Sequence, residues 1–289
     1  MIVARTNREL HEHLGGPRRD GRSIGLVPTM GYLHEGHLSL LRAARERCDV
    51  VVMSLFVNPA QFGPGEDLAT YPRDEARDLE LAEGAGVDVV YAPPVEEVYP
   101  NGFATTVAVG GALTTVLDGA PEQRGQAHFH GVTTVVAKLF NTVGPDIAFF
   151  GQKDAQQALV IRRMVRDLDF RVQVEVLPTV RAPDGLAMSS RNAYLTPEER
   201  ERALALSRAL GAAESVAAAG ETRSDAALAA ARAVLQEAGI EPEYLEARDA
   251  ETLDPAASLN GRPVLIAVAA RVGPARLIDN IVIPEGGIR

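Results

Sequence analysis

Short apolar runs alternate with segments of helical periodicity along the first two-thirds of the chain. Strands are expected at residues 23–29, 49–58, 87–92, 146–150 and 171–180, and helices at 35–47, 73–83, 132–143 and 154–168. The run 49–58, DVVVMSLFVN, is apolar at nearly every position, which is typical of a strand with both faces buried in a parallel sheet. This alternation predicts a Rossmann-like, doubly wound parallel α/β sheet with right-handed crossovers.

The pattern changes after Val180. Residues 181–192, RAPDGLAMSSRN, are rich in turn residues, and Thr196 and Pro197 then mark a helix start. Alanine-rich helices are expected at 197–218 and 224–238, followed by strands at 244–247, 263–270 and 276–283. We therefore expect a domain of residues 1–181 and a smaller C-terminal α+β domain of residues 182–289.

Composition excludes several kinds of partner and site. With 29 basic and 39 acidic residues the net charge is −10, which makes a poor counterion for nucleic acid or an anionic membrane. The single cysteine, Cys48, excludes an intrachain disulfide and any site built from several thiolates. The start MIVARTNREL does not resemble a signal peptide, and no run approaches the roughly 18 apolar residues of a membrane helix. We expect a soluble, cytoplasmic protein without nucleic-acid or membrane partners.

The segment 28–37, PTMGYLHEGH, directly follows the first of the strands listed above. Gly31 permits a tight turn, and the helix that begins here offers free N–H groups and a dipole that suit an anion. His34 and His37 face the same way, and each can donate a hydrogen bond. The alternatives are a surface helix start with incidental histidines, or a metal site, which would need a third ligand although Glu35 points elsewhere. The chain has no Walker A loop and no G-x-G-x-x-G fingerprint, so phosphate would have to be held at this turn.

Two further segments have the residue types of a phosphate site. Residues 188–191, MSSR, place two hydroxyls and a guanidinium in the loop between the expected domains, where they could form a mobile clamp. Residues 149–154, FFGQKD, lie at the carboxyl end of an expected strand, where ligands bind in open α/β sheets. The alternatives are a turn with an N-cap serine and an ordinary solvated βα turn. Against the second, Lys153 is one of only two lysines in an arginine-rich chain, which indicates a place where a guanidinium would not fit.

Together with these motifs, three others resemble the pantothenate synthetase family of the nucleotidyltransferase superfamily: FVNPAQF at 56–62, YPR at 71–73 and HFHGV at 128–132. The 149–154 segment matches the family as part of the longer run FGQKDAQQ at 150–157. The run 178–192, PTVRAPDGLAMSSRN, also matches. PTMGYLHEGH is similar to the HIGH-type nucleotide motif of that superfamily, and MSSR to its KMSKS-type loop. The similarity spans essentially the whole chain, with the motifs in the family's order.

The resemblance implies an ATP-dependent acid–amine ligase. Pantoate carboxylate would attack the α-phosphorus of ATP and release pyrophosphate, and the β-alanine amine would then attack the enzyme-bound pantoyl adenylate and release AMP. The first domain would bind nucleotide and pantoate, and the second would act as a lid. Mg²⁺ would accompany ATP, and a homodimer is expected.

The resemblance also implies the site residues. Catalytic roles would fall to His37, the proposed proton donor, with His34, Lys153, Ser189, Ser190 and Arg191. ATP would be lined by Met30, Gly31, Tyr32, Leu33, His34, Glu35, Gly36, His37, Gly151, Gln152, Lys153, Asp154, Val180, Met188, Ser189, Ser190 and Arg191. Gln61 and Gln157 would bind pantoate or β-alanine, because an amide offers both a donor and an acceptor. Without the resemblance, both would be taken as exposed glutamines. Asp78 is a candidate metal ligand.

Two departures from the family pattern leave questions open. Arg124 stands one residue further from His128 than the family's arginine usually does, without the usual proline, so its reach into the site is undetermined. Gln152 replaces a usual glutamate beside the lysine and removes a charge there. Two other functions remain alternatives: an adenylyl- or cytidylyltransferase that leaves the nucleotide on its product, and a nucleotide-binding regulator without turnover. Gln61, Gln157 and the second domain disfavour the first, and intact MSSR and GQKD motifs disfavour the second.

Overall fold

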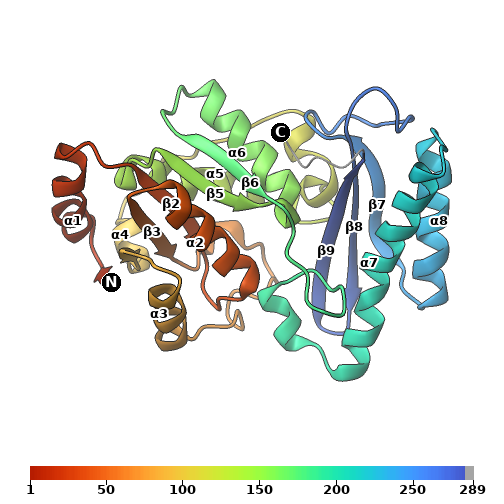
Figure 1. Cartoon of the computed structure of the whole chain (residues 1–289), viewed down its shortest axis with the longest axis horizontal. Helices are drawn as coiled ribbons and strands as arrows, with labels where there is room; N and C mark the ends of the chain where they lie inside the picture. The colour runs from red at the N-terminus through yellow and green to blue at the C-terminus, as the bar shows by residue number, and fades with distance from the viewer. Residues whose placement is uncertain (284–289) are drawn as a thin grey trace.

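A parallel sheet of six strands forms the larger part of the structure, a computed structural model that describes residues 1–283 (Figure 1). Its strands lie in the order β1-β4-β3-β2-β5-β6. They are β1 (Ile2–Ala4), β2 (Ile24–Thr29), β3 (Val50–Leu55), β4 (Val89–Tyr91), β5 (Ile147–Gly151) and β6 (Gln173–Leu177). The helices between them are α1 (Asn7–Arg19), α2 (Glu35–Arg47), α3 (Glu75–Gly84), the short α4 (Val95–Val98), α5 (Gly125–Val143) and α6 (Ala155–Asp167). The predicted doubly wound α/β sheet is confirmed.

Both faces of this sheet are covered by helices. On β3, Val50 and Val52 pack in one hydrophobic cluster with residues of α1, α5 and α6, whereas Val51 and Met53 pack in another with residues of α2 and α3. Side chains alternate between the faces of a strand, so a strand covered on both sides must be apolar at successive positions. This confirms the interpretation of the 49–58 run.

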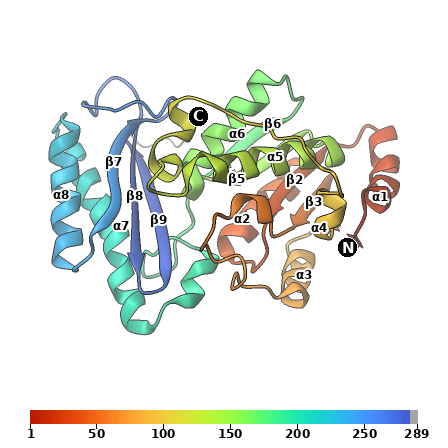
Figure 2. The same cartoon turned by 180° about the vertical axis from the view of Figure 1, so that it is seen from behind.

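A second, antiparallel sheet lies beside the first, and α7 (Pro197–Ala218) and α8 (Ser224–Glu237) lie on its far side (Figures 1 and 2). Its strands are β7 (Pro242–Asp249), β8 (Val264–Val272) and β9 (Ala275–Ile283), in that order. On β8, Ile266 packs with α7 and α8, whereas Leu265 and Ala267 belong to the cluster that contains α5 and α6. The domain boundary at 181/182 stays a prediction and lies in the connection between β6 and α7. The last residues of the expected second domain, 284–289, lie outside the described residues.

The structure differs from the sequence prediction at two helices. Helix α5 begins at Gly125, seven residues before the expected start. Helix α1 was not anticipated, because it contains Gly15, Gly16 and Pro17, which disfavour a helix interior. A capping box offsets this, since Thr6 and Glu9 each accept a hydrogen bond from the other's backbone N–H, both at 3.2 Å. Strands β1 and β4 and helix α4 are short; of these, only β4 was predicted.

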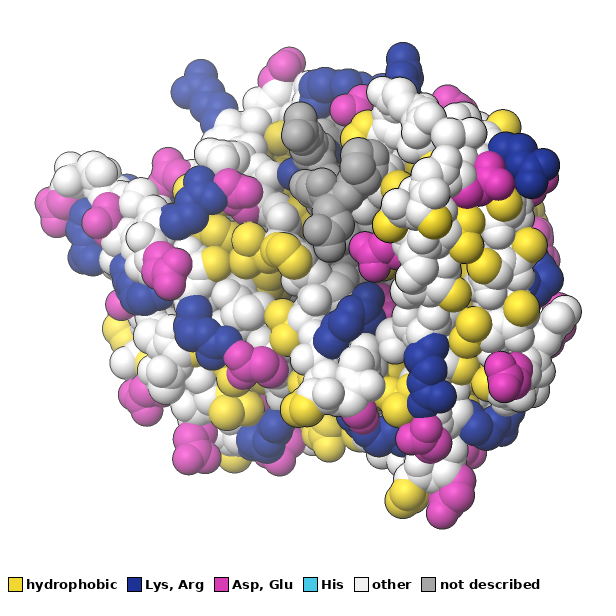
Figure 3. Space-filling model, turned by 45° about the vertical axis from the view of Figure 1, so that its right-hand side comes forward, with side chains coloured by type: hydrophobic (Ala, Val, Ile, Leu, Met, Phe, Trp, Pro, Cys, Tyr) yellow, Lys and Arg dark blue, Asp and Glu magenta, His cyan; other side chains and the backbone are white. Residues whose placement is uncertain are grey.

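Charged side chains of both signs lie on the surface. On the face drawn in Figure 3, the described basic and acidic side chains are interspersed and form no continuous basic area. Within residues 1–283, none of the helices is both long enough and apolar enough to cross a bilayer.

Candidate active site

Two neighbouring strands at the centre of the larger sheet bring the predicted segments together. The chain leaves β2 toward β3 on one side and leaves β5 toward β6 on the other, so the sheet order reverses between them. In open α/β sheets, ligands bind at the carboxyl ends of strands at such a switch point. The turn at 30–37 follows β2 and the turn at 151–154 follows β5, and both contribute to a cavity of about 240 Å³.

Most of the predicted site residues line this cavity, and some do not. Those that line it are Met30, His34, Gly36, His37, Gln61, Gly151, Lys153, Asp154, Gln157, Val180, Met188, Ser189, Ser190 and Arg191. Those outside the lining are Gly31, Tyr32, Leu33, Glu35, Asp78 and Gln152. Leu33 is buried in the cluster beneath α2, and Glu35 pairs with Arg42 on the same helix. The roles assigned to all these residues stay predictions.

The turn after β2 is held from outside the cavity. Gly31 and Tyr32 both have positive φ, at 85° and 50°. Asp78 of α3 is buried and accepts hydrogen bonds from the backbone N–H groups of Tyr32 and Leu33, both at 2.7 Å. A Cβ on Gly31 would lie 2.9 Å from Asp78 Oδ2. Asp78 is therefore placed to fix the turn, and it is not among the residues that line the cavity.

His34 and His37 stack at the start of α2, with ring centroids 4.0 Å apart and planes inclined by 29°. His37 Nδ1 accepts the backbone N–H of His34 at 3.3 Å, which leaves the proton of the neutral ring on Nε2. Burial and then the Lys153 ammonium lower the pKa of His37 to about 4. Burial, His37 and Lys153 lower the pKa of His34 to about 2. Both rings are thus neutral near pH 7, and His37 offers a neutral N–H.

His34 Nδ1 is buried and has no hydrogen-bond partner among residues 1–283. Buried polar atoms in folded proteins are nearly always paired, so such an atom at a cavity wall is typical of a ligand site. Lys153 lines the same cavity, with its side chain 19% exposed and its Nζ 3.8 Å from Asp154 Oδ2. The cavity thus combines neutral donors with one ammonium.

The 188–191 loop closes the cavity from the side of the second domain. Ser190 is buried, and its hydroxyl donates to the carbonyl of Tyr32 at 3.3 Å. This bond joins the loop to the turn at 30–37, which we call the histidine turn. Arg191 donates from Nε and Nη2 to both oxygens of Asp67, at 2.9 and 2.8 Å, and lies over the ring of Tyr71. Burial alone would raise the pKa of Asp67, but the Arg191 guanidinium beside it lowers that pKa below its usual value. Nη1 of Arg191 is not used by this pair and stays available to an anion.

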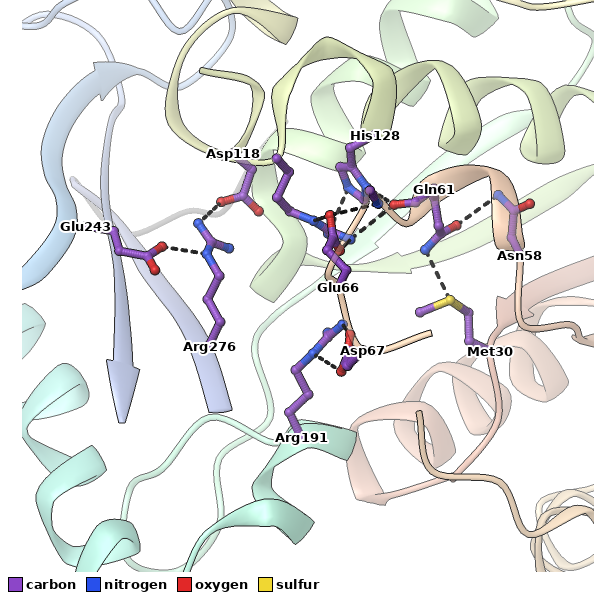
Figure 4. Close-up of polar contacts among 12 residues, drawn as sticks. Met30, Asn58, Gln61, Glu66, Asp67, Asp118, His128, Arg191, Glu243 and Arg276 are labelled. Atoms are coloured by element: carbon purple, nitrogen blue, oxygen red, sulfur yellow. Dashed lines mark hydrogen bonds and ion pairs between the residues drawn. The ribbon is translucent and has the colours of Figure 1, made fainter. Parts of the chain in front are cut away.

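Gln61, which lines the cavity, lies at the centre of a hydrogen-bonded group (Figure 4). Its side-chain oxygen accepts from Asn58 Nδ2 at 3.1 Å, so its NH₂ group faces Met30 Sδ, also at 3.1 Å. Its backbone carbonyl accepts from His128 Nδ1 at 2.8 Å. The side-chain amide is therefore held in one orientation and presents donors to the cavity. Gln157, by contrast, makes no side-chain hydrogen bond within residues 1–283.

Arg124 does reach the cavity. It donates from Nη1 to His128 Nε2 at 3.0 Å and from Nη2 to the Gln61 carbonyl at 3.2 Å, and it pairs with Glu66 at 2.7 Å. Because α5 begins at Gly125 with Arg124 as its N-cap, Arg124 and His128, four residues apart, lie on the same side of the helix start. Burial, then Arg124, lowers the pKa of His128 to about 4.

Sequence reasoning missed Asn58, Glu66 and Asp67, which hold Gln61, Arg124 and Arg191 respectively. Asn58 stood inside a quoted motif, but Glu66 and Asp67 lie in a segment without a pattern.

Within the described residues, no cluster of three or more His, Cys, Asp or Glu side chains could hold a metal by itself. Asp154 is a half-exposed carboxylate on the cavity wall beside Lys153. Mg²⁺ is commonly bound by one or two carboxylates together with substrate phosphates, and the donor set here fits that arrangement.

Comparison with known proteins places the chain beside one enzyme family. Residues 2–282 match the sequence pattern of the family described as pantoate-beta-alanine ligase. The pantothenate synthetase of Moorella thermoacetica is 57% identical over 287 residues, covering 98% of this chain and 99% of that protein. The pantothenate synthetase of Geobacter sulfurreducens is 53% identical over 270 residues, or 93% of each chain.

Two solved structures extend the comparison. The pantothenate synthetase of Thermus thermophilus has a TM-score of 0.91 at 50% identity and covers 97% of this chain and 99% of its own. The pantoate-beta-alanine ligase of Francisella tularensis, crystallised with beta-gamma ATP and beta-alanine, has a TM-score of 0.82 at 30% identity and covers 99% of each chain.

Proposed function

The chain belongs to the pantoate–β-alanine ligase family and is an ATP-dependent ligase, and from this premise we propose how its cavity condenses pantoate with β-alanine. In the first step a pantoate carboxylate oxygen bonds to the α-phosphorus of ATP as pyrophosphate leaves. In the second, the β-alanine amine bonds to the carbonyl carbon of the pantoyl adenylate, AMP leaves, and the amine loses a proton. No group on the protein becomes covalently attached.

The first step needs charge neutralisation and alignment more than a protein nucleophile. Lys153 supplies a positive charge in the cavity, and His37 supplies a neutral Nε2–H there. Arg191 adds its unused Nη1 once the loop is in place. Mg²⁺ would arrive with ATP, with Asp154 as the carboxylate that faces it, and would offset phosphate charge.

Gln61 is the residue we assign to pantoate. Because the bond from Asn58 to its oxygen orients the amide, Gln61 can donate into the cavity, which suits the carboxylate or hydroxyl oxygens of a small dihydroxy acid. Gln157, on the first turns of α6, would complete this subsite. Asp78 would position the histidine turn and would not bind metal.

We also propose that the second domain acts as a lid over the nucleotide and that the enzyme is a cytoplasmic homodimer. The lid is supported by the connection of the 188–191 loop to the histidine turn through Ser190. The dimer and its location are supported by the family alone. Analytical ultracentrifugation of the purified chain tests the dimer.

The observation that carries the mechanism is the meeting of the histidine turn, Lys153 and the fixed amide of Gln61 around one cavity at the switch point. The test is isotope exchange. Labelled pyrophosphate should enter ATP when pantoate is present and β-alanine is absent, and AMP should be released only when β-alanine is added. Nucleotide retained on the product would favour a nucleotidyltransferase, and binding without exchange or turnover would favour a regulator.

A further inference from the structure

Strand β9 of the second domain contacts the first domain along one face. Arg276, Ile278 and Asn280 stand two residues apart and therefore share that face. At one end, Arg276 donates to Asp118 at 2.8 Å and to Glu243 at 2.6 Å (Figure 4). At the other end, Asn280 is 4% exposed and lines the cavity.

The Asn280 amide holds the backbone on which Lys153 stands. Its Nδ2 donates to the carbonyl of Gln152 at 3.0 Å and to the carbonyl of Lys153 at 2.9 Å. These carbonyls belong to the two peptide planes that meet at the Lys153 Cα. Since each peptide is planar and only φ and ψ are free, bonds to both planes fix the direction in which the Lys153 side chain leaves the backbone.

The local structure gives a reason for this support. Residues Gln152–Asp154 form a single 3₁₀ turn between β5 and α6, and 3₁₀ hydrogen bonds have poorer geometry than those of an α-helix. Asn280 Oδ1 is buried without a partner within residues 1–283, so the amide is held by its two donated bonds. The neighbouring Asp279 forms a two-point ion pair with Arg181, which fixes β9 beside the start of the 181–192 loop.

We infer that Asn280 is a positioning residue for Lys153. Through the two bonds from its amide to the Gln152 and Lys153 carbonyls, the position of the second domain determines where the Lys153 ammonium lies during adenylate formation. The inference rests on the proposed function only in naming adenylate formation as the step that Asn280 affects. Its structural half, that Asn280 controls Lys153, can be tested without turnover.

The chain offers an unusual probe, because Lys138 and Lys153 are its only lysines. Protein labelled with [¹³Cε]lysine gives two side-chain signals, assigned with a Lys138→Arg variant. Lys138 lies over the ring of Phe103, 4.9 Å from its centroid, and serves as an internal reference. In Asn280→Leu, the Lys153 signal should move and the Lys138 signal should not.

A matched variant separates the amide contacts from general loosening between the domains. Arg276→Met breaks the contacts at the other end of the same face of β9 and should leave the Lys153 signal in place. An unmoved Lys153 signal in folded Asn280→Leu, or an equal shift in Arg276→Met, would overturn the inference. Thermal melting establishes folding. Should Asn280→Leu not fold, Asn280→Ser replaces it, since a hydroxyl can donate to only one of the two carbonyls, and a smaller shift is expected.

Kinetics give the second measurement. Displacing a reacting group by about 1 Å can reduce a rate on the order of a hundredfold, so adenylate formation should fall roughly tenfold to a hundredfold. ATP affinity should change less than about threefold, because the contacts are to the backbone and not to ATP. A loss of ATP affinity equal to the loss of rate would make Asn280 a nucleotide ligand and refute the positioning role. Absence of adenylate in the unmodified enzyme would instead refute the proposed function, and the lysine signals would still decide the Asn280–Lys153 connection.

Discussion

Replacing Gly131 with alanine should damage pantoate use through a backbone clash. Gly131 lies on the face of α5 that packs against the turn Pro59–Gln61, and its carbonyl accepts from Asn58 Nδ2 at 3.1 Å. An added Cβ would lie 2.1 Å from the carbonyl oxygen of Ala60 and 2.6 Å from the backbone nitrogen of Gln61, whereas ordinary contact begins at 3.4 Å. Both neighbours are backbone atoms, so no side chain can rotate away. The turn that carries Gln61 must move.

The size of the effect follows from that distance. Restoring ordinary contact requires a shift of about 1 Å in the turn, and a misplacement of that size at a substrate-positioning group reduces the rate on the order of a hundredfold. Overpacking of this kind also destabilises a fold by roughly 1–3 kcal/mol. The kcat/KM for pantoate should therefore fall about a hundredfold, while ATP affinity, which we assign to the histidine turn and Lys153, should change little.

The assay is steady-state kinetics with pantoate and ATP varied in turn, together with thermal melting. Gly211→Ala in α7 is the control, because an added Cβ there meets nothing within 4 Å. It should stabilise the protein by roughly 0.5–1 kcal/mol and leave the kinetics unchanged. Unaltered pantoate kinetics in folded Gly131→Ala would refute the reasoning, as would an equal loss for both substrates.

Three further predictions follow from the site. Gln61→Ala should reduce kcat/KM for pantoate about tenfold to a hundredfold while ATP binding, measured by calorimetry, barely changes; an equal loss for ATP would make Gln61 part of the scaffold. Lys153→Arg should nearly abolish single-turnover adenylate formation with an unchanged melting temperature, because a planar fork cannot approach one phosphate oxygen as an ammonium does; a near-normal rate would show that only charge is needed. The pKa values of His37 and His128 are lowered to about 4 in the folded protein. As the pH falls from 6.5 toward 4, these two histidines therefore take up protons in the unfolded chain but not in the folded one. The free energy of unfolding should fall over that range by up to about 1.4 kcal/mol per pH unit for each histidine, and urea melts with equal midpoints at pH 7 and pH 5 would contradict this.

Much of the architecture was determined by local sequence. The expected strands at 23–29 and 146–150 and the helices at 35–47 and 197–218 agree with the structure to within one residue at each end. Their signals are local, namely apolar periodicity, a proline at the first helical position and acidic residues in the first turn, so no distant contact was needed to read them. The alternation of strand and helix then restricted the topology and predicted ligand binding at the carboxyl ends of the strands. The strand order, which only the tertiary structure gives, makes β2 and β5 the pair at the switch point.

The contacts that fix the site were decided only by the tertiary structure. Asp78 holds the histidine turn across 45 residues, Asp67 holds Arg191 across 124, and Asn280 holds the Lys153 backbone across 127. A carboxylate or amide has no intrinsic periodicity, and its role depends on which donor or acceptor the folded chain brings within about 3 Å. The same holds for the histidines, because their residue type allows either protonation state. Burial, with the nearby ammonium of Lys153 or guanidinium of Arg124, makes them neutral.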